Sequence, residues 1–152
     1  MHSSLLLYPS SLMIFLTLFL YVKNYLDNVK ATKSQKIKFG YFKVYKGDVP
    51  DYITLSRQTL KNQFELPILF YFLVTMHIAY DNLNFISLLF SWIFVISRYV
   101  HCYIRLTSNY VPYRASLFKV GMLTLGVWWI YFVMVTVCLN MLFLFLKEWI
   151  YV

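Results

Sequence analysis

The chain has 152 residues, of which 61% are apolar, 21% are aromatic and only 13% are charged. Soluble domains average about 45–50% apolar and about 25% charged residues. The composition therefore excludes a soluble globular domain and a disordered chain, and it indicates a single polytopic membrane domain. The net charge of +8 would suggest nucleic-acid binding in a soluble protein. In a membrane protein, an excess of Lys and Arg marks the loops on the cytoplasmic side, where they face anionic lipids. We therefore expect membrane lipids and no nucleic acid as partners.

Charged residues divide the chain into four apolar segments. A helix needs about 20 predominantly apolar residues to cross a bilayer, and each segment supports one such helix. The predicted membrane helices are residues 5–26, 57–81, 83–106 and 112–147. We therefore predict an all-α integral membrane protein, a bundle of four transmembrane helices that forms one domain over residues 1–152. The first segment lacks a basic start and a small-residue cleavage site, so we keep it as a helix rather than a signal peptide.

The longest polar connection is residues 27–56, where six lysines are interleaved with Phe39, Tyr41, Phe42 and Tyr45. One interpretation is a solvated loop on the membrane surface with its rings at headgroup level. The other is a lid or a partner-binding loop. This connection and the third one are rich in Lys and Arg, whereas the second has neither. The positive-inside rule therefore places both of them in the cytoplasm and both termini on the opposite side of the membrane.

Several residues that are often functional have simpler structural interpretations here. The two cysteines, Cys102 and Cys138, lie in apolar runs without a CxxC motif, so we expect small core residues and no metal site. His77 and Asp81 are one helical turn apart, which favours a capping and surface pair over a metal site. The glycines of the fourth predicted helix are expected to allow close helix contact: Gly121 and Gly126.

The first functional cluster lies at the start of the second predicted helix. Asn62 and Glu65 are about 60° apart on a continuous helix, and Lys61 is one turn before Glu65. Pro67 disrupts the hydrogen-bond ladder and can free a carbonyl group toward the same cavity. The alternative is an interfacial ion pair between Lys61 and Glu65 that binds no ligand.

The second cluster follows the spacing i, i+3, i+7 on the third predicted helix. Arg98, His101 and Arg105 share one helix face and need a counter-charge at membrane depth, from Glu65 or from a bound anion. Arg114 follows at the start of the next helix, where free N–H groups attract anions. The alternative is that the arginines extend to the lipid headgroups, which explains Arg105 better than Arg98, about 10 Å deeper.

These residues predict a positively charged pocket between helices that faces the cytoplasm. The sequence lacks the P-loop, GxGxxG and HExxH motifs and any Ser-His-Asp arrangement, so covalent nucleophilic catalysis has no support. A pocket with several arginines, one acid, one amide and one imidazole suits a small anion that also carries an amine.

The same residues resemble the MAPEG family, the membrane-associated proteins in eicosanoid and glutathione metabolism, and its bacterial branch in particular. The similar motifs are Asn62-Gln-Phe-Glu65-Leu-Pro67, Ser97-Arg98-x-x-His101 and Pro112-x-Arg114. The resemblance implies a homotrimer of four-helix protomers that binds glutathione between protomers near the cytoplasmic face. It further implies a transferase or peroxidase that acts on a lipophilic electrophile dissolved in the bilayer.

The resemblance also implies roles for individual residues. Arg114 would be the catalytic residue that stabilises the glutathione thiolate. The glutathione-binding residues would be Asn62, Glu65, Arg98, His101 and Arg105. The alternative function is a non-catalytic accessory subunit of a larger membrane complex, whose basic pocket holds a lipid headgroup.

Overall fold

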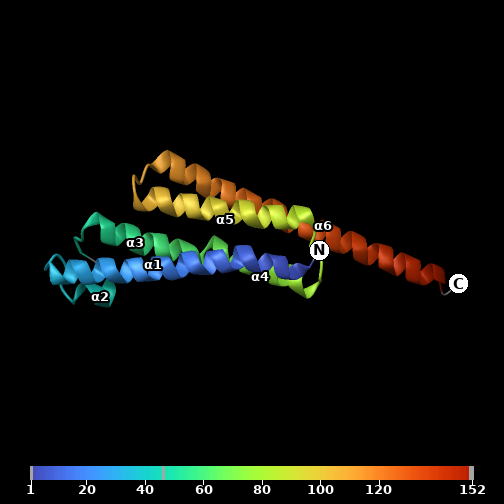
Figure 1. Cartoon of the computed structure of the whole chain (residues 1–152), viewed down its shortest axis with the longest axis horizontal. Helices are drawn as coiled ribbons and strands as arrows, with labels where there is room; N and C mark the ends of the chain where they lie inside the picture. The colour runs from blue at the N-terminus through green and yellow to red at the C-terminus, as the bar shows by residue number, and fades with distance from the viewer. Residues whose placement is uncertain (1, 46, 151–152) are drawn as a thin grey trace.

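The computed structural model describes residues 2–45 and 47–150, and every regular element in this part of the chain is helical. The main helices are α1 (Leu7–Lys33), α2 (Tyr41–Val44), α3 (Asp51–Lys61), α4 (Leu66–Ala79), α5 (Phe85–Leu106) and α6 (Val111–Ile150). Two short 3-10 helices, η1 (Ser3–Leu6) and η2 (Asn62–Phe64), precede α1 and α4. Figure 1 shows α5 and α6 side by side as a pair, and α1 beside α3 and α4 as a second group.

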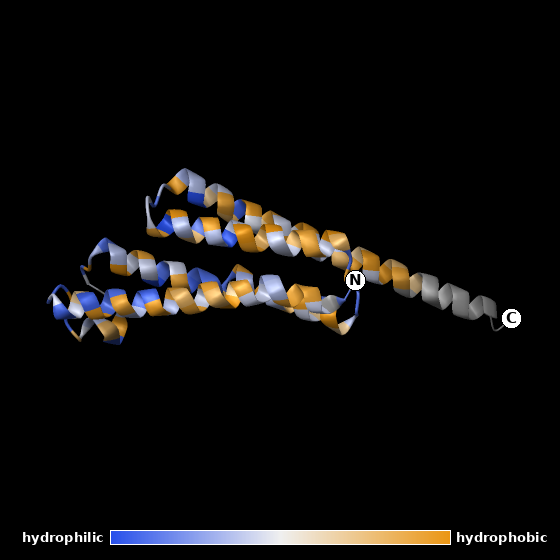
Figure 2. Cartoon of the chain, viewed as in Figure 1, coloured by the Kyte–Doolittle hydropathy of each residue, from blue (hydrophilic) through white to orange (hydrophobic). Residues whose placement is uncertain are grey.

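Among the residues that the structure describes, three helical stretches are long and apolar enough to cross a bilayer: Ser4–Lys33, Phe85–Leu106 and Val111–Leu139. Hydrophilic residues gather at the end of the bundle that carries α2, the start of α3 and the α5–α6 turn (Figure 2). The protein is therefore an all-helical integral membrane protein. The first and third connections lie at the same end of the bundle, as the lysine and arginine pattern requires (Figure 1).

The prediction of one continuous helix over residues 57–81 is wrong. The segment begins earlier, at Asp51, and is interrupted by η2 and by Glu65, whose φ of −105° and ψ of −100° are not helical. Pro67 explains the break, because its ring cannot donate a backbone hydrogen bond and clashes with the preceding turn. Proline is tolerated in the first turn of a helix, so α4 starts afresh around it.

The connection over residues 27–56 is shorter and more ordered than expected. Helix α1 continues to Lys33, supported by an ion pair of 2.7 Å between Lys23 and Asp27, one turn apart. Beyond α1 the chain folds back through α2, and a small core of Ala31, Ile37, Tyr41 and Ile53 joins the connection to α1 and α3.

The main core lies where α1, α4, α5 and α6 meet. The rings of Phe70 and Phe94 stack with centroids 4.9 Å apart, and Trp128 is fully buried beside them. Gly121 of α6 permits the close approach of α5, because an added Cβ would lie 2.9 Å from the Ser97 hydroxyl. The prediction for Gly121 is therefore confirmed. Gly126 permits no such contact within the single chain, because an added Cβ there would meet no described atom within 4 Å.

Two further expectations about single side chains are corrected. Cys102 is buried as predicted, but Cys138 is exposed on α6. His77 is not a surface residue, because its ring is buried and stacks on Trp128 with centroids 5.3 Å apart. Its Nδ1 lies 2.7 Å from the carbonyl oxygen of Asn82, so it closes the turn after α4 from inside the core.

Candidate functional site

The three basic residues of α5 share its buried face. Arg98 is 0%, His101 2% and Arg105 9% exposed. The spacing i, i+3, i+7 predicts this common face. The idea that Arg98 extends to the headgroups is wrong for the single chain, because its guanidinium lies wholly inside the packed helices.

Arg98 carries a charge that the described part of the chain does not neutralise. Its Nε, Nη1 and Nη2 atoms have no hydrogen-bond partner there. Its guanidinium lies over the Phe118 ring of α6, with Cζ 5.4 Å from the ring centroid, and Glu65 attracts it without forming an ion pair. A buried cation without an ion pair destabilises the folded protein, so a bound anion beside this guanidinium would be stabilising.

His101 connects α5 to the start of α6. Its Nδ1 lies 2.8 Å from the carbonyl oxygen of Arg114, which can only accept a hydrogen bond, so Nδ1 carries a proton. Its Nε2 is buried and has no partner among the described residues. The Nε2 atom of the imidazole is therefore available to a further hydrogen-bond partner, on the same face of α5 as Arg98.

Arg105 connects α5 to the broken segment. Its Nη2 donates to Gln58 Oε1 over 2.7 Å. In the amide orientation that satisfies both groups of Asn62, Arg105 Nη1 donates to the Asn62 oxygen over 3.0 Å. Asn62 then donates to the Gln58 carbonyl oxygen over 3.1 Å. Both hydrogen-bond partners of this guanidinium are neutral amides, and it forms no direct ion pair with a described residue, although Glu65 attracts it from a longer distance.

Sequence reasoning missed the two glutamines that hold this region together. Gln58 supports Arg105, and Gln63, which is buried, donates to the Cys102 sulfur over 3.3 Å. The available signal was the spacing of Gln58 and Asn62, which are four residues apart and therefore share one face of the helix that carries the first predicted cluster. Without the position of α5, nothing distinguishes these amides from surface residues.

Arg114 is half-buried in the first turn of α6. Its Nη1 donates to the Asn109 side-chain oxygen at the α5–α6 turn, and its backbone carbonyl holds His101. The guanidinium thus lies at the polar end of the bundle, close to the start of the helix as predicted.

Glu65 does not fulfil its predicted contacts in the single chain. It is exposed at the break between η2 and α4, and it forms no ion pair with Lys61, Arg98 or any other described residue. Both predictions assumed a continuous helix, in which Lys61 and Glu65 would stack one turn apart. The 3-10 turn changes their relative direction, so Asn62 faces Arg105 while Glu65 faces outward.

Comparison with family models gives one match, the MAPEG family, over residues 6–134. The chain belongs to the MAPEG family. The matched region runs from η1 into α6 and contains every site residue named above. No curated protein and no solved structure matches the chain.

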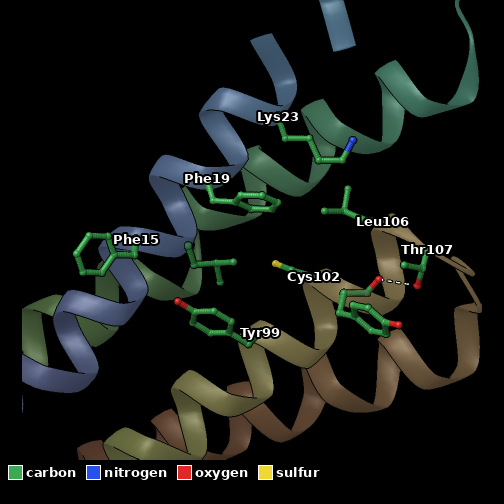
Figure 3. Close-up of a pocket in the computed structure, with 9 residues that line it drawn as sticks. Phe15, Phe19, Lys23, Tyr99, Cys102, Leu106 and Thr107 are labelled. Atoms are coloured by element: carbon green, nitrogen blue, oxygen red, sulfur yellow. Dashed lines mark hydrogen bonds between the residues drawn. The ribbon is translucent and has the colours of Figure 1, made fainter. Parts of the chain in front are cut away.

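This MAPEG chain also has an apolar groove of about 550 Å³ between α1 and α5. Figure 3 shows Phe19 of α1 and Cys102 of α5 facing each other across it, with Lys23 at its polar end. The buried arginine face and this groove are therefore neighbouring faces of α5, and Cys102, one helical turn after Arg98, lies at the border between them. The arrangement places an apolar surface within one helix diameter of a cationic one.

Proposed function

We propose that this MAPEG protein binds glutathione, or a small anion of the same chemistry, at the cytoplasmic end of the bundle. We further propose that it uses the thiol against a lipophilic electrophile, as a transferase or peroxidase. The observation that carries the proposal is Arg98, fully buried with three unpartnered nitrogen atoms.

The charge balance of the cluster supports an anionic ligand. Arg98 has no polar partner in the described chain, and Arg105 and Arg114 donate to neutral amides. A guanidinium binds a carboxylate through two parallel hydrogen bonds, which are stronger than bonds to an amide. Two carboxylates of one glutathione would offset part of this charge. The exposed and unpaired Glu65 at the same end is suited to the ammonium group.

Arg114 is the proposed catalytic residue. It is half-buried at the polar end of the bundle, and Asn109 holds its guanidinium in place. A fixed cation lowers the free energy of a nearby thiolate relative to the thiol. Glutathione would supply the nucleophilic sulfur, and the apolar groove on the neighbouring face of α5 is suited to a lipophilic partner.

We propose that the protein acts as a homotrimer with four membrane spans. Helix α4 has 14 residues, about 21 Å, which is shorter than a hydrocarbon core of about 30 Å. Together α3, η2 and α4 are long enough, so the fourth span would be a broken helix. Because Arg98 is sealed within one chain, a ligand would reach it through a movement of helices or across an interface between protomers.

Glutathione-dependent thermal stabilisation of the purified protein in mild detergent tests the function. We expect a saturable rise in Tm at millimolar glutathione, weakened in Arg114→Ala and in Glu65→Gln. Lys119→Gln, which removes an exposed charge further along α6, is the matched control and keeps the shift. Absence of any shift in the wild-type protein would overturn the proposal.

The sealed position of Arg98 also favours a second function, an accessory subunit of a larger membrane complex. In that case the basic cluster would hold a lipid headgroup and carry out no reaction. Native mass spectrometry after mild extraction distinguishes the two: fixed-stoichiometry partners support the subunit, and a lone homotrimer contradicts it.

A further inference from the structure

The connection between α1 and α3 is an ordered segment that packs against both helices, and not a loop extended into solvent. Its fold-back segment, residues 34–45, returns from the end of α1 and is anchored by Ile37 and Tyr41 in the small core with Ala31 and Ile53. Arg57 of α3 donates to the Tyr41 hydroxyl over 3.1 Å.

The end of this segment is held in an unusual conformation. Tyr45 has a φ of 53°, which a bulky residue adopts only where its surroundings enforce it. Arg57 lies over the Tyr45 ring, 5.0 Å from its centroid, and the ring makes edge contacts with Tyr41 and Phe42. The segment is thus fixed against α3 by a cation–π contact and a cluster of rings.

The position of the segment along α1 places it at the edge of the membrane. Residues 4–22 of the first candidate span carry no charge and are about 28 Å long, close to the hydrocarbon thickness. Tyr21 and Asn24 of α1 therefore mark the boundary with the headgroups. Val44 and Tyr45 line the same cavity as these two residues, so the end of the fold-back segment returns to that boundary.

The outer surface of the segment has the composition of a membrane-surface element. Phe39 is 79%, Val44 64% and Tyr45 51% exposed. Three lysines on the same segment are exposed and form no ion pair with a described residue: Lys36, Lys38 and Lys43. Exposed rings beside unpaired cations at the boundary are complementary to apolar acyl chains and anionic phosphates.

We propose that the fold-back segment binds the anionic phospholipids of the leaflet next to it. Phe39, Val44 and Tyr45 insert at the level of the glycerol groups, and the lysines contact lipid phosphates. This site is separate from the arginine face of α5 and does not depend on the function proposed above.

Depth-dependent fluorescence of the full-length protein in vesicles tests the geometry. A nitrobenzoxadiazole label on Phe39→Cys, in a Cys138→Ser background, reports the insertion, because buried Cys102 is protected from labelling. Ser34→Cys is the matched control, since it lies at the end of α1, about 15 Å beyond the boundary. We expect blue-shifted emission and quenching by shallow spin-labelled lipids at position 39 but not at position 34. Water-like emission at position 39, or its cross-linking between copies of the chain, would overturn the proposal.

The preference of the protein for anionic over zwitterionic lipid tests the role of the three lysine charges. Spin-labelled phosphatidylglycerol and phosphatidylcholine should associate with the protein unequally in phosphatidylcholine vesicles, with a preference for phosphatidylglycerol that falls at high salt. The triple variant Lys36→Gln, Lys38→Gln, Lys43→Gln should reduce that preference by about fivefold or more. Lys119→Gln, on α6, should leave it nearly unchanged. An equal loss in Lys119→Gln, or an unchanged preference in the triple variant, would refute lipid binding by this segment.

Discussion

The contact between α5 and α6 can be tested with two glycines of the same helix. Gly121 and Gly126 both lie in α6, five residues apart, but only Gly121 faces another helix among the described residues. An alanine Cβ at position 121 would lie 2.9 Å from Ser97 Oγ and 3.7 Å from Arg98 Cδ. The comparison of Gly121→Ala with Gly126→Ala therefore separates helix packing from helix propensity.

The expected magnitude follows from three effects. Alanine stabilises a helix by about 1 kcal/mol relative to glycine, and this gain applies at both positions. Overpacking a tight site costs about 1–3 kcal/mol, at position 121 alone. The Ser97 hydroxyl cannot rotate away freely, because it donates to the Phe94 carbonyl oxygen over 2.7 Å, a bond worth about 1 kcal/mol. We expect Gly121→Ala to be less stable than Gly126→Ala by about 1–4 kcal/mol.

Thermal unfolding in detergent, followed by tryptophan fluorescence, measures the difference. About 1 kcal/mol corresponds to about 2–4 °C in Tm for a chain of this size. Ser97→Ala keeps the Cβ of the serine and removes the oxygen that clashes, so it should recover most of the loss when combined with Gly121→Ala. Equal Tm values for the two glycine variants, or no recovery in the double variant, would refute the close approach of α5 and α6 at this point.

Three other substitutions give distinct outcomes. Arg98→Leu should increase the free energy of unfolding of the ligand-free protein by up to about 4 kcal/mol, and so raise its Tm. The same variant should not be stabilised by glutathione, which thermal shift assays with and without ligand will show. Gln58→Glu should stabilise the ligand-free protein by pairing with Arg105 and weaken binding of glutathione measured by calorimetry; unchanged affinity would argue against a role for Arg105. His77→Ala should lower the Tm by several degrees, because it removes a ring stacked on Trp128, whereas His77→Phe, which keeps a ring there, should lose less.

The sequence predicts features that depend on composition and on helix periodicity. The charge-free runs identify the candidate spans, and the spacing of Arg98, His101 and Arg105 identifies the buried face of α5. Both rest on regular repeats along one helix, which need no knowledge of neighbouring helices.

Features that depend on contacts between distant segments were missed. The break at Glu65 depends on how far Pro67 disrupts a helix whose sequence pattern looks continuous. The 3-10 turn then leaves Asn62 facing Arg105, as expected, and turns Glu65 outward, which was not expected. The pairing of Gln58 with Arg105 joins residues 47 positions apart, so no local pattern signals it. The exposure of Gly126 likewise depends on which side of α6 the helix α5 occupies.

The three basic residues of α5 differ in how well the protein satisfies them, and the difference follows their depth. Arg105 donates to two amides, His101 has one carbonyl partner, and Arg98 has no polar partner in the described chain. Arg98 is seven residues, or about 10 Å, further from the polar end than Arg105. In the proposed function, a carboxylate that binds at that end would replace an amide partner of Arg105 with a stronger charged one, and so weaken one of the contacts between α3 and α5. The anion would then loosen the packing of these two helices on its way to Arg98.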